Sequence, residues 1–198
     1  MAVLWLAACA STGSGHGPPP ELEDWAAGPV RWYLLSSERR AIQEVGSSTE
    51  AVNFIEQFWH LRDPDPETPE NSFRELFASR VEAADLLYAE GSIRGSLTPR
   101  GRALVLLGPP VHLQVATEPV LSWSAKKNRQ ERVITREVDV EVWRYPPEDL
   151  PERFEAVLRA RGIVDGAELR FQVEPAGTRL VEGEELLQLA AAMAVVAE

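Results

Sequence analysis

The spacing of apolar residues changes from a helical to a strand period near the middle of this chain, and this change constrains the fold most. Between residues 48 and 88, apolar side chains recur three or four positions apart, as they do on one face of a helix. From about residue 103 onward, short apolar runs and alternating segments replace that pattern. Because helices come first and strands later, the sequence predicts an α+β fold with a small antiparallel sheet.

The first half predicts a helical hairpin. A short helix is expected over residues 37–45, and a longer one is expected to begin after Ser47, which can cap its first turn. That helix should end at Asp63, because the residue before a proline is disfavoured in helical conformation. A third helix is expected from Thr68, as its capping residue, to about Gly91. Two long amphipathic helices with a short link predict an antiparallel hairpin packed on the sheet.

The second half predicts the sheet and two further helices. Strands are expected over 103–107, 111–115, 133–143 and 169–173, with a helix over 151–161 and a C-terminal helix over 184–196. The C-terminal helix has two interpretations: it closes the domain core, or it offers an apolar face to another protein.

Composition excludes some classes of partner. The net charge is -11 and the pI is about 4.9, so electrostatics oppose binding to nucleic acid or to an anionic bilayer. No segment after the first residues reaches the roughly 18 apolar residues that a membrane span requires. A domain of roughly 175 residues buries enough surface to fold without a disulfide or a metal. No cofactor is therefore expected.

The N-terminus carries a signal for location. Cys9 is the single cysteine and ends an apolar run that starts at Ala2. The segment Leu6-Ala7-Ala8-Cys9 resembles a bacterial lipoprotein signal, in which small residues fit the peptidase and the thiol takes a diacylglycerol. Secretory signals normally carry a basic residue before the apolar core, and none is present here, so we expect the true start to lie upstream of Met1. The alternative is a cytosolic protein with an apolar N-terminus that ends at Cys9 by chance.

The lipoprotein interpretation divides the chain into three parts. Residues 1–8 would be a signal segment truncated at its start, and residues 9–24 a lipid-anchor cysteine with a flexible linker rich in Gly, Ser and Pro. Residues 25–198 would form a single domain. The expected location is the cell envelope, on the periplasmic side and with the outer membrane favoured, with the protein held to the membrane through lipidated Cys9.

A series of short segments forms a recognisable pattern in the first three quarters of the chain. In order, they are FIEQFW (54–59), RDPDPET (62–68), Asn71, the helix around Arg80, Gly101-Arg102, LGPP (107–110) and the strand from Trp143 to Tyr145. Together they resemble the GWxTD domain proteins, a bacterial family of unknown function whose members are often exported or lipid-anchored. The similarity spans about residues 32–145. The resemblance implies an envelope protein and assigns no catalytic residue.

The chain departs from this family at the motif that names it. The corresponding segment reads Gly95-Ser96-Leu97-Thr98-Pro99, so that Ser96 stands where the family has tryptophan and Pro99 where it has aspartate. If those two residues carry a family activity, this member lacks it.

An acidic link joins the two long helices, and Arg80 follows it on the apolar face of the next helix. A guanidinium near a core must be paired, because an uncompensated buried charge is costly. We therefore expect Arg80 to bind Asp63, Asp65 and Glu56 across the hairpin as a structural latch.

The acidic link has a second interpretation as a calcium site. Alternate carboxylates can converge on a hard cation, but an EF-hand loop counted from Asp63 would have Thr68 where glycine is needed and Arg74 where an acidic ligand is needed. No metal site is therefore assigned. The basic segment around Lys126, Lys127, Arg129 and Arg132 is either a solvated loop or a contact for an anionic polymer or an acidic partner.

The sequence favours a non-enzymatic protein-binding or assembly module with an envelope protein as partner. The alternative is a hydrolase of cell-envelope polymer that acts through carboxylates or His60, although no nucleophile motif accompanies that histidine. A surface cleft that gathers Asp63, Asp65, His60 and Arg102 would favour the enzyme. Their burial in helix packing would favour the binding module.

Overall fold

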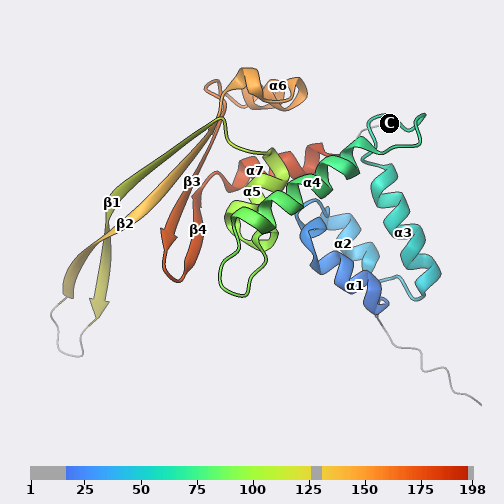
Figure 1. Ribbon diagram of the computed structural model, residues 1–198, viewed down its shortest axis with the longest axis horizontal. Coiled ribbons are helices and arrows are strands. Elements are labelled where there is room, and N and C mark those ends of the chain that lie inside the picture. The colour runs from blue at the N-terminus through green and yellow to red at the C-terminus, as the bar shows by residue number, and fades with distance from the viewer. Residues whose placement is uncertain (1–16, 126–130, 196–198) are drawn as a thin grey trace, which may run out of the picture.

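The computed structural model describes residues 17–125 and 131–195, and the side chains of all of these except 121–134. Seven helices and a four-stranded antiparallel sheet form the described part, which confirms the predicted α+β class. Figure 1 shows a helical body with the sheet extending from one side of it. The helices are α1 (Pro20–Ala27), α2 (Ser36–Ile42), α3 (Ser48–His60), α4 (Ser72–Leu87), α5 (Pro99–Leu107), α6 (Glu152–Ala160) and α7 (Glu184–Met193), with short 3₁₀ turns η1 (Pro29–Trp32), η2 (Gly95–Leu97) and η3 (Pro147–Asp149).

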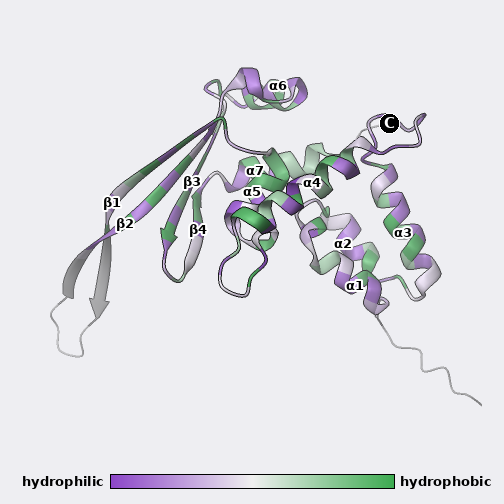
Figure 2. Ribbon diagram, viewed as in Figure 1, coloured by the Kyte–Doolittle hydropathy of each residue, from purple (hydrophilic) through white to green (hydrophobic). Residues whose placement is uncertain are grey.

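The sheet is a meander in which each strand pairs with the next along the chain, in the order β1-β2-β3-β4. Its strands are β1 (His112–Ala125), β2 (Glu131–Tyr145), β3 (Ala167–Glu174) and β4 (Gly177–Glu182). β3 pairs with β2 only over residues 139–145, whereas β1 pairs with β2 along its whole length. The far half of the β1–β2 hairpin is therefore a two-stranded arm that extends away from the helices (Figure 1). Hydrophilic and hydrophobic residues alternate along the coloured part of both strands of the hairpin (Figure 2).

The two faces of the sheet bury different amounts of apolar surface. Trp143, Leu169 and Phe171 share the face that packs on the helices, and none of the three has exposed surface. On the opposite face Val140 and Val142 lie in a second, smaller cluster of buried valines. Arginine and glutamate side chains form ion pairs across this second face, such as Arg170–Glu118, Arg170–Glu182 and Arg144–Glu168.

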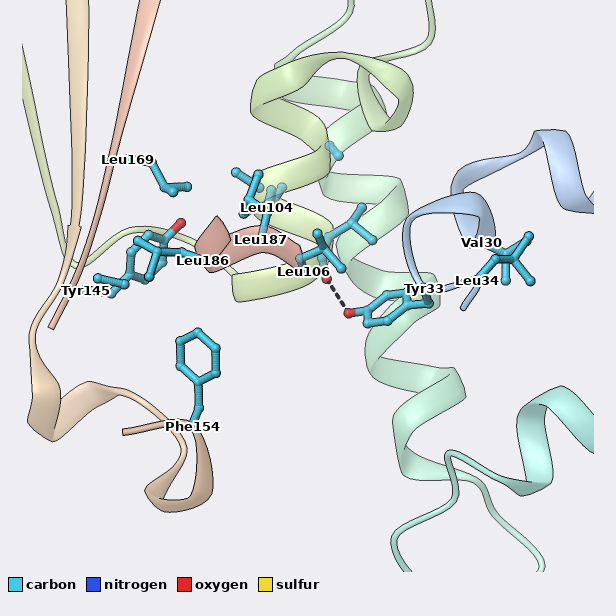
Figure 3. Close-up of a cluster of buried hydrophobic side chains, with 14 of the residues drawn as sticks. Val30, Tyr33, Leu34, Leu104, Leu106, Tyr145, Phe154, Leu169, Leu186 and Leu187 are labelled. Carbon is cyan, nitrogen blue, oxygen red and sulfur yellow. Dashed lines mark hydrogen bonds between the residues drawn. The ribbon is translucent and has the colours of Figure 1, made fainter. Parts of the chain in front are cut away.

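Helix α5 lies at the centre of the main core, although the sequence predicted a strand over residues 103–107. Leu104 and Leu106 pack among side chains from α7 and the sheet, as Figure 3 shows. A short run that is apolar on every side suits a buried strand and a buried helix equally, so its periodicity cannot separate the two. The deciding signals precede and follow it: Thr98 caps the helix from its N-terminal end, and Gly108 ends it with a φ of 85°.

Helices α3 and α4 meet near their link and then diverge, so the predicted hairpin is an open one. Trp59 contacts Phe73 and Phe77 close to the link, with ring centroids 6.3 and 5.3 Å apart. Beyond it, α3 packs on α1 and α4 packs on α5 (Figure 1). Asn71, rather than Thr68, caps α4: its Oδ1 accepts from the Arg74 amide at 2.9 Å.

The folded domain begins earlier than predicted. Residues 20–24, assigned to the linker, lie in α1, and Leu22 has no exposed surface. Trp25 of the same helix meets Phe58 edge to face at 5.0 Å. At the other end of the chain, buried Leu186 and Leu187 of α7 belong to the core, which favours the core-closing reading of the C-terminal helix. None of the helices in the described residues is long and apolar enough to span a bilayer.

Candidate functional site

Arg80 does not bind the carboxylates that the sequence analysis assigned to it. Its Nη1 donates hydrogen bonds to the backbone carbonyls of Val105 and Leu106, each at 3.2 Å. Within the described ranges Arg80 makes no ion pair with Asp63, Asp65 or Glu56, so the predicted latch is wrong. Asp63 instead accepts a hydrogen bond from the backbone amide of Asp65 within the link, and Glu56 is exposed. The physical reason is the divergence of α3 and α4, which carries Arg80 toward α5.

Three side chains from separate elements bind the carbonyl end of α5. Tyr33 donates its hydroxyl to the Val105 carbonyl at 2.8 Å, the dashed line in Figure 3, and Tyr145 donates to the Gly108 carbonyl at 3.1 Å. Burial raises the pKa of both phenols, so both stay protonated donors. Arg80 adds a positive charge where the helix dipole is negative. The last carbonyls of a helix lack partners within it, and these contacts satisfy them.

The ion pair that ties the helices together is Arg62–Glu38, which the sequence analysis did not single out. Arg62 has no exposed surface, and its two terminal nitrogens each lie 2.8 Å from a Glu38 oxygen. It also donates to the carbonyls of Phe58 and Tyr33, and its guanidinium lies 3.7 Å from the centre of the Phe58 ring. One feature of the sequence could have predicted that Arg62 is buried. Arg62 follows Phe58 by four positions and so continues the apolar stripe of α3 just beyond the end of that helix.

Residues 95–99, the segment compared with the GWxTD motif, have a structural role. Ser96 is fully buried, and its amide and hydroxyl donate to Asp85 Oδ1 at 2.8 and 2.6 Å. The Trp32 indole donates to the Ser96 carbonyl at 2.8 Å. Thr98 accepts from the Gly101 amide at 3.2 Å and so caps α5. These residues hold η2 between α4 and α5.

The residues considered for a hydrolase do not come together. His60 and Asp65 are exposed around the α3–α4 link, and Asp63 is half-buried there. Arg102 lies in α5, where it makes a bidentate ion pair with Glu184 of α7, with nitrogen–oxygen distances of 2.7 and 2.8 Å. They are thus neither gathered in one cleft nor buried together in helix packing.

Two further features bear on metal and anion binding. In the part of the chain that the structure describes, no three His, Cys, Asp or Glu residues are arranged to hold a metal ion. Of the basic segment, Lys126, Lys127 and Arg129 lie outside the described residues, as does the side chain of Arg132.

A cleft of about 570 Å³ opens between α4, the start of α6 and the end of α7. Tyr33 and Arg80 line it, together with Glu148 and Asp149 of η3 and Arg153 from the first turn of α6. Its volume lies within the range of small-molecule sites, which are mostly apolar with a few polar groups. The apolar lining includes Phe73, Leu76, Leu107, Leu150, Phe154 and Met193.

The edge strand β1 carries a second unusual surface. Leu113 and Val115 are 52% and 60% exposed, and Val111, just before the strand, is 47% exposed. Leu113 pairs with Trp143 in the sheet register, so this row shares the face that the helices cover farther along the sheet. The helices do not reach β1 (Figure 1). The sheet thus continues its apolar face beyond its helical cover.

The chain matches no family model, no curated protein and no solved structure.

Proposed function

We propose that this protein is a lipid-anchored, non-enzymatic binding module of the bacterial cell envelope, and that its partner is another envelope protein that docks on β1. The main observation in support is a row of exposed apolar residues at the start of edge strand β1: Val111 just before it, and Leu113 and Val115 within it. The partner is an extended segment that adds a strand to the sheet and places apolar side chains at alternate positions.

An edge strand is suited to this kind of recognition because one side of its backbone lacks a partner strand. Among residues 17–125 and 131–195, β1 pairs only with β2, so the amides and carbonyls along its other side are available to bind an added strand. Natural edge strands are normally short or carry charges that discourage pairing. β1 runs for 14 residues, and within β1 no charged residue separates Leu113 from Val115 on their face. Glu141 of β2 lies opposite Val115, and its charge is paired with Arg100.

The length of the arm also supports a partner. Residues 131–138 of β2 pair with β1 alone, and a two-stranded hairpin is marginally stable in water. A third strand along β1 would cover the apolar row and stabilise the arm. A binding role needs no catalytic cluster, which agrees with the dispersal of His60, Asp65 and Arg102.

The envelope location rests on the sequence. Cys9 ends a segment that resembles a lipoprotein signal, and residues 54–145 carry most of the similarity to the GWxTD proteins. A lipidated Cys9 would place the domain at a membrane surface without a spanning helix. A single acyl chain gives only marginal membrane binding, whereas a multiply acylated cysteine anchors stably.

The test is crosslinking in native membranes followed by mass spectrometry. We expect crosslinks from residues 111–117 to one envelope protein, and their loss in the double variant Leu113→Lys/Val115→Lys. Leu86→Lys is the matched control, because Leu86 is 82% exposed on α4, away from β1. Crosslinks to a second copy of this chain alone, or equal crosslinking by both variants, would refute docking of another protein on β1.

A further inference from the structure

We infer that the cleft between α4, α6 and α7 binds a long-chain fatty acid, with its carboxylate on Arg80 and its alkyl chain along the apolar lining. This site is separate from β1 and does not depend on the proposed docking of a protein there. The inference rests on the free donors of Arg80, on the lining of the cleft and on its volume.

Arg80 has donors to spare for a carboxylate. Its Nη1 is occupied by the carbonyls of Val105 and Leu106, and no further backbone or carboxylate acceptor among the described residues takes its Nε or Nη2. The Tyr33 hydroxyl also lies beside the guanidinium, whose charge opposes the rise that burial causes in the pKa of this phenol. Nε and Nη2 form one edge of the guanidinium, and such an edge binds both oxygens of a carboxylate at once.

The guanidinium of Arg80 packs closely against the backbone of Gly108. A Cβ at Gly108 would lie 2.8 Å from Nη2 and 3.5 Å from Nε, and glycine has none. A glycine is also required there because its φ is 85°. The same residue therefore ends α5 and fixes the position of the Arg80 guanidinium at the cleft.

The rest of the cleft is suited to a hydrocarbon chain rather than to a polar ligand. Leu76 and Phe73 contribute one wall from α4, and Phe154 and Met193 contribute from α6 and α7. Leu76 is 48% exposed, which is a large apolar surface for a residue at the edge of a core. Burial of an alkyl chain against such a lining is favourable, because it removes apolar surface from water.

The charges at the cleft select the orientation of the ligand. Glu148 and Asp149 lie in η3, before α6, and Arg153 lies in the first turn of α6, whereas Arg80 is the cation contributed by α4. Glu148 and Asp149 repel a carboxylate, so the head group would lie away from them, at Arg80. No carboxylate in the described residues forms an ion pair with Arg80, which leaves its charge available.

The test is equilibrium binding of palmitate to the full chain, measured below the critical micelle concentration with hexadecanol as the uncharged control. We expect saturable binding at one site and at least about tenfold weaker binding of hexadecanol, since a hydrogen-bonded charge is lost. Arg80→Met should weaken palmitate binding by a similar factor and leave hexadecanol binding nearly unchanged. Leu76→Glu should abolish binding of both, and Leu86→Glu on the same helix should change neither.

Arg80 also binds the end of α5, so circular dichroism must establish that Arg80→Met is folded. If it is not, the comparison of Leu76→Glu with Leu86→Glu still decides whether the cleft is the site, and hexadecanol still decides the role of the carboxylate. Absence of palmitate binding to the unaltered chain would overturn the inference. Equal binding of palmitate and hexadecanol, or full palmitate binding by folded Leu76→Glu, would also overturn it.

Discussion

Arg62 and Glu38 form a bidentate ion pair in which both nitrogen–oxygen distances are 2.8 Å, and the arginine has no exposed surface. The pair joins the end of α3 to the start of α2. The same glutamate accepts the Leu35 amide at 2.8 Å and so caps α2. A buried pair contributes little net stability compared with an apolar pair, but loss of one partner leaves an isolated charge in the core.

Removal of Glu38 should therefore destabilise the domain strongly. We expect Glu38→Ala to lower the free energy of unfolding by about 3–5 kcal/mol, because Arg62 would remain buried without its carboxylate. Urea unfolding followed by circular dichroism measures this change. Glu56→Ala is the control, since Glu56 is exposed on α3 and should change stability by less than about 0.5 kcal/mol. Equal effects of the two substitutions would contradict the assignment of Arg62–Glu38 as the latch.

Introducing the tryptophan and the aspartate of the GWxTD motif at positions 96 and 99 should have different consequences at the two positions. Ser96→Trp should prevent stable folding, because Ser96 is fully buried and bound to Asp85. Pro99→Asp should change stability by less than about 1 kcal/mol, because both proline and an acidic residue suit the first position of a helix. Thermal unfolding of the two variants checks this, and a stable Ser96→Trp protein would show that the site has room for a tryptophan.

Gly95 should be intolerant of any side chain. A Cβ there would lie 1.9 Å from the Ala84 carbonyl oxygen, so η2 could not stay against α4. We expect Gly95→Ala to cost about 3 kcal/mol or more. Gly46→Ala, where the nearest atom would be 3.8 Å away, should be close to neutral in the same unfolding experiment. A neutral Gly95→Ala variant would mean that η2 can move away from α4 without loss.

Asp85, Glu90 and Glu184 should make the free energy of unfolding depend on pH. Burial acts to raise the pKa of Asp85 and of Glu90, but hydrogen bonds from neighbouring groups outweigh it and hold both below their usual values. The hydrogen bond from Arg102 lowers the pKa of Glu184. A depressed folded-state pKa stabilises the fold above the unfolded-state value, which is about 3.9 for Asp and 4.3 for Glu. That stability should be lost as the pH falls from about 4.3 through the lower folded-state values.

The substitution Asp85→Asn tests the contribution of the Asp85 carboxyl group to this pH dependence. At pH 7 the variant should be less stable than the unaltered protein, and the difference should shrink as the pH falls below about 4. Asp165→Asn, in an exposed loop, should follow the unaltered protein at every pH. Unfolding in urea between pH 3 and 7 measures the three curves. A constant difference across that range would show that protonation of Asp85 is not coupled to folding.

The proposed anchor predicts the behaviour of a single substitution. Cys9→Ser should release the protein from the membrane fraction, because serine cannot form the thioether to diacylglycerol. The domain itself should unfold at the same denaturant concentration as before. Cell fractionation with immunoblotting, and the intact mass of the purified protein, measure the two outcomes. A Cys9→Ser protein that stays in the membrane fraction, or a cysteine with no added lipid mass, would exclude this anchor.

Local patterns predicted much of the secondary structure. α3, α6, β2 and β3 lie where periodicity and capping residues placed them, because those signals act within a few residues. Residues 103–107 were assigned to a strand because burial on all sides removes the period that separates helix from strand. β4 was missed because its six residues bury too little of one face to show a clear alternation.

The partners of the charged residues could not be predicted in this way. Arg80 lies near acidic residues in sequence, yet it binds the carbonyls of α5, because α3 and α4 open away from each other. Arg62 binds Glu38 across 24 positions, a pairing that depends on where α2 packs.

The sequence by itself determined the α+β class, the order of most elements and the candidate anchor at Cys9, since each follows from composition or short-range spacing. Only the tertiary structure decided that Arg62 forms the buried ion pair, that Arg80 binds the last carbonyls of α5, and which surfaces stay exposed. Those features depend on contacts between segments far apart along the chain, and on the limited reach of the helices over the sheet.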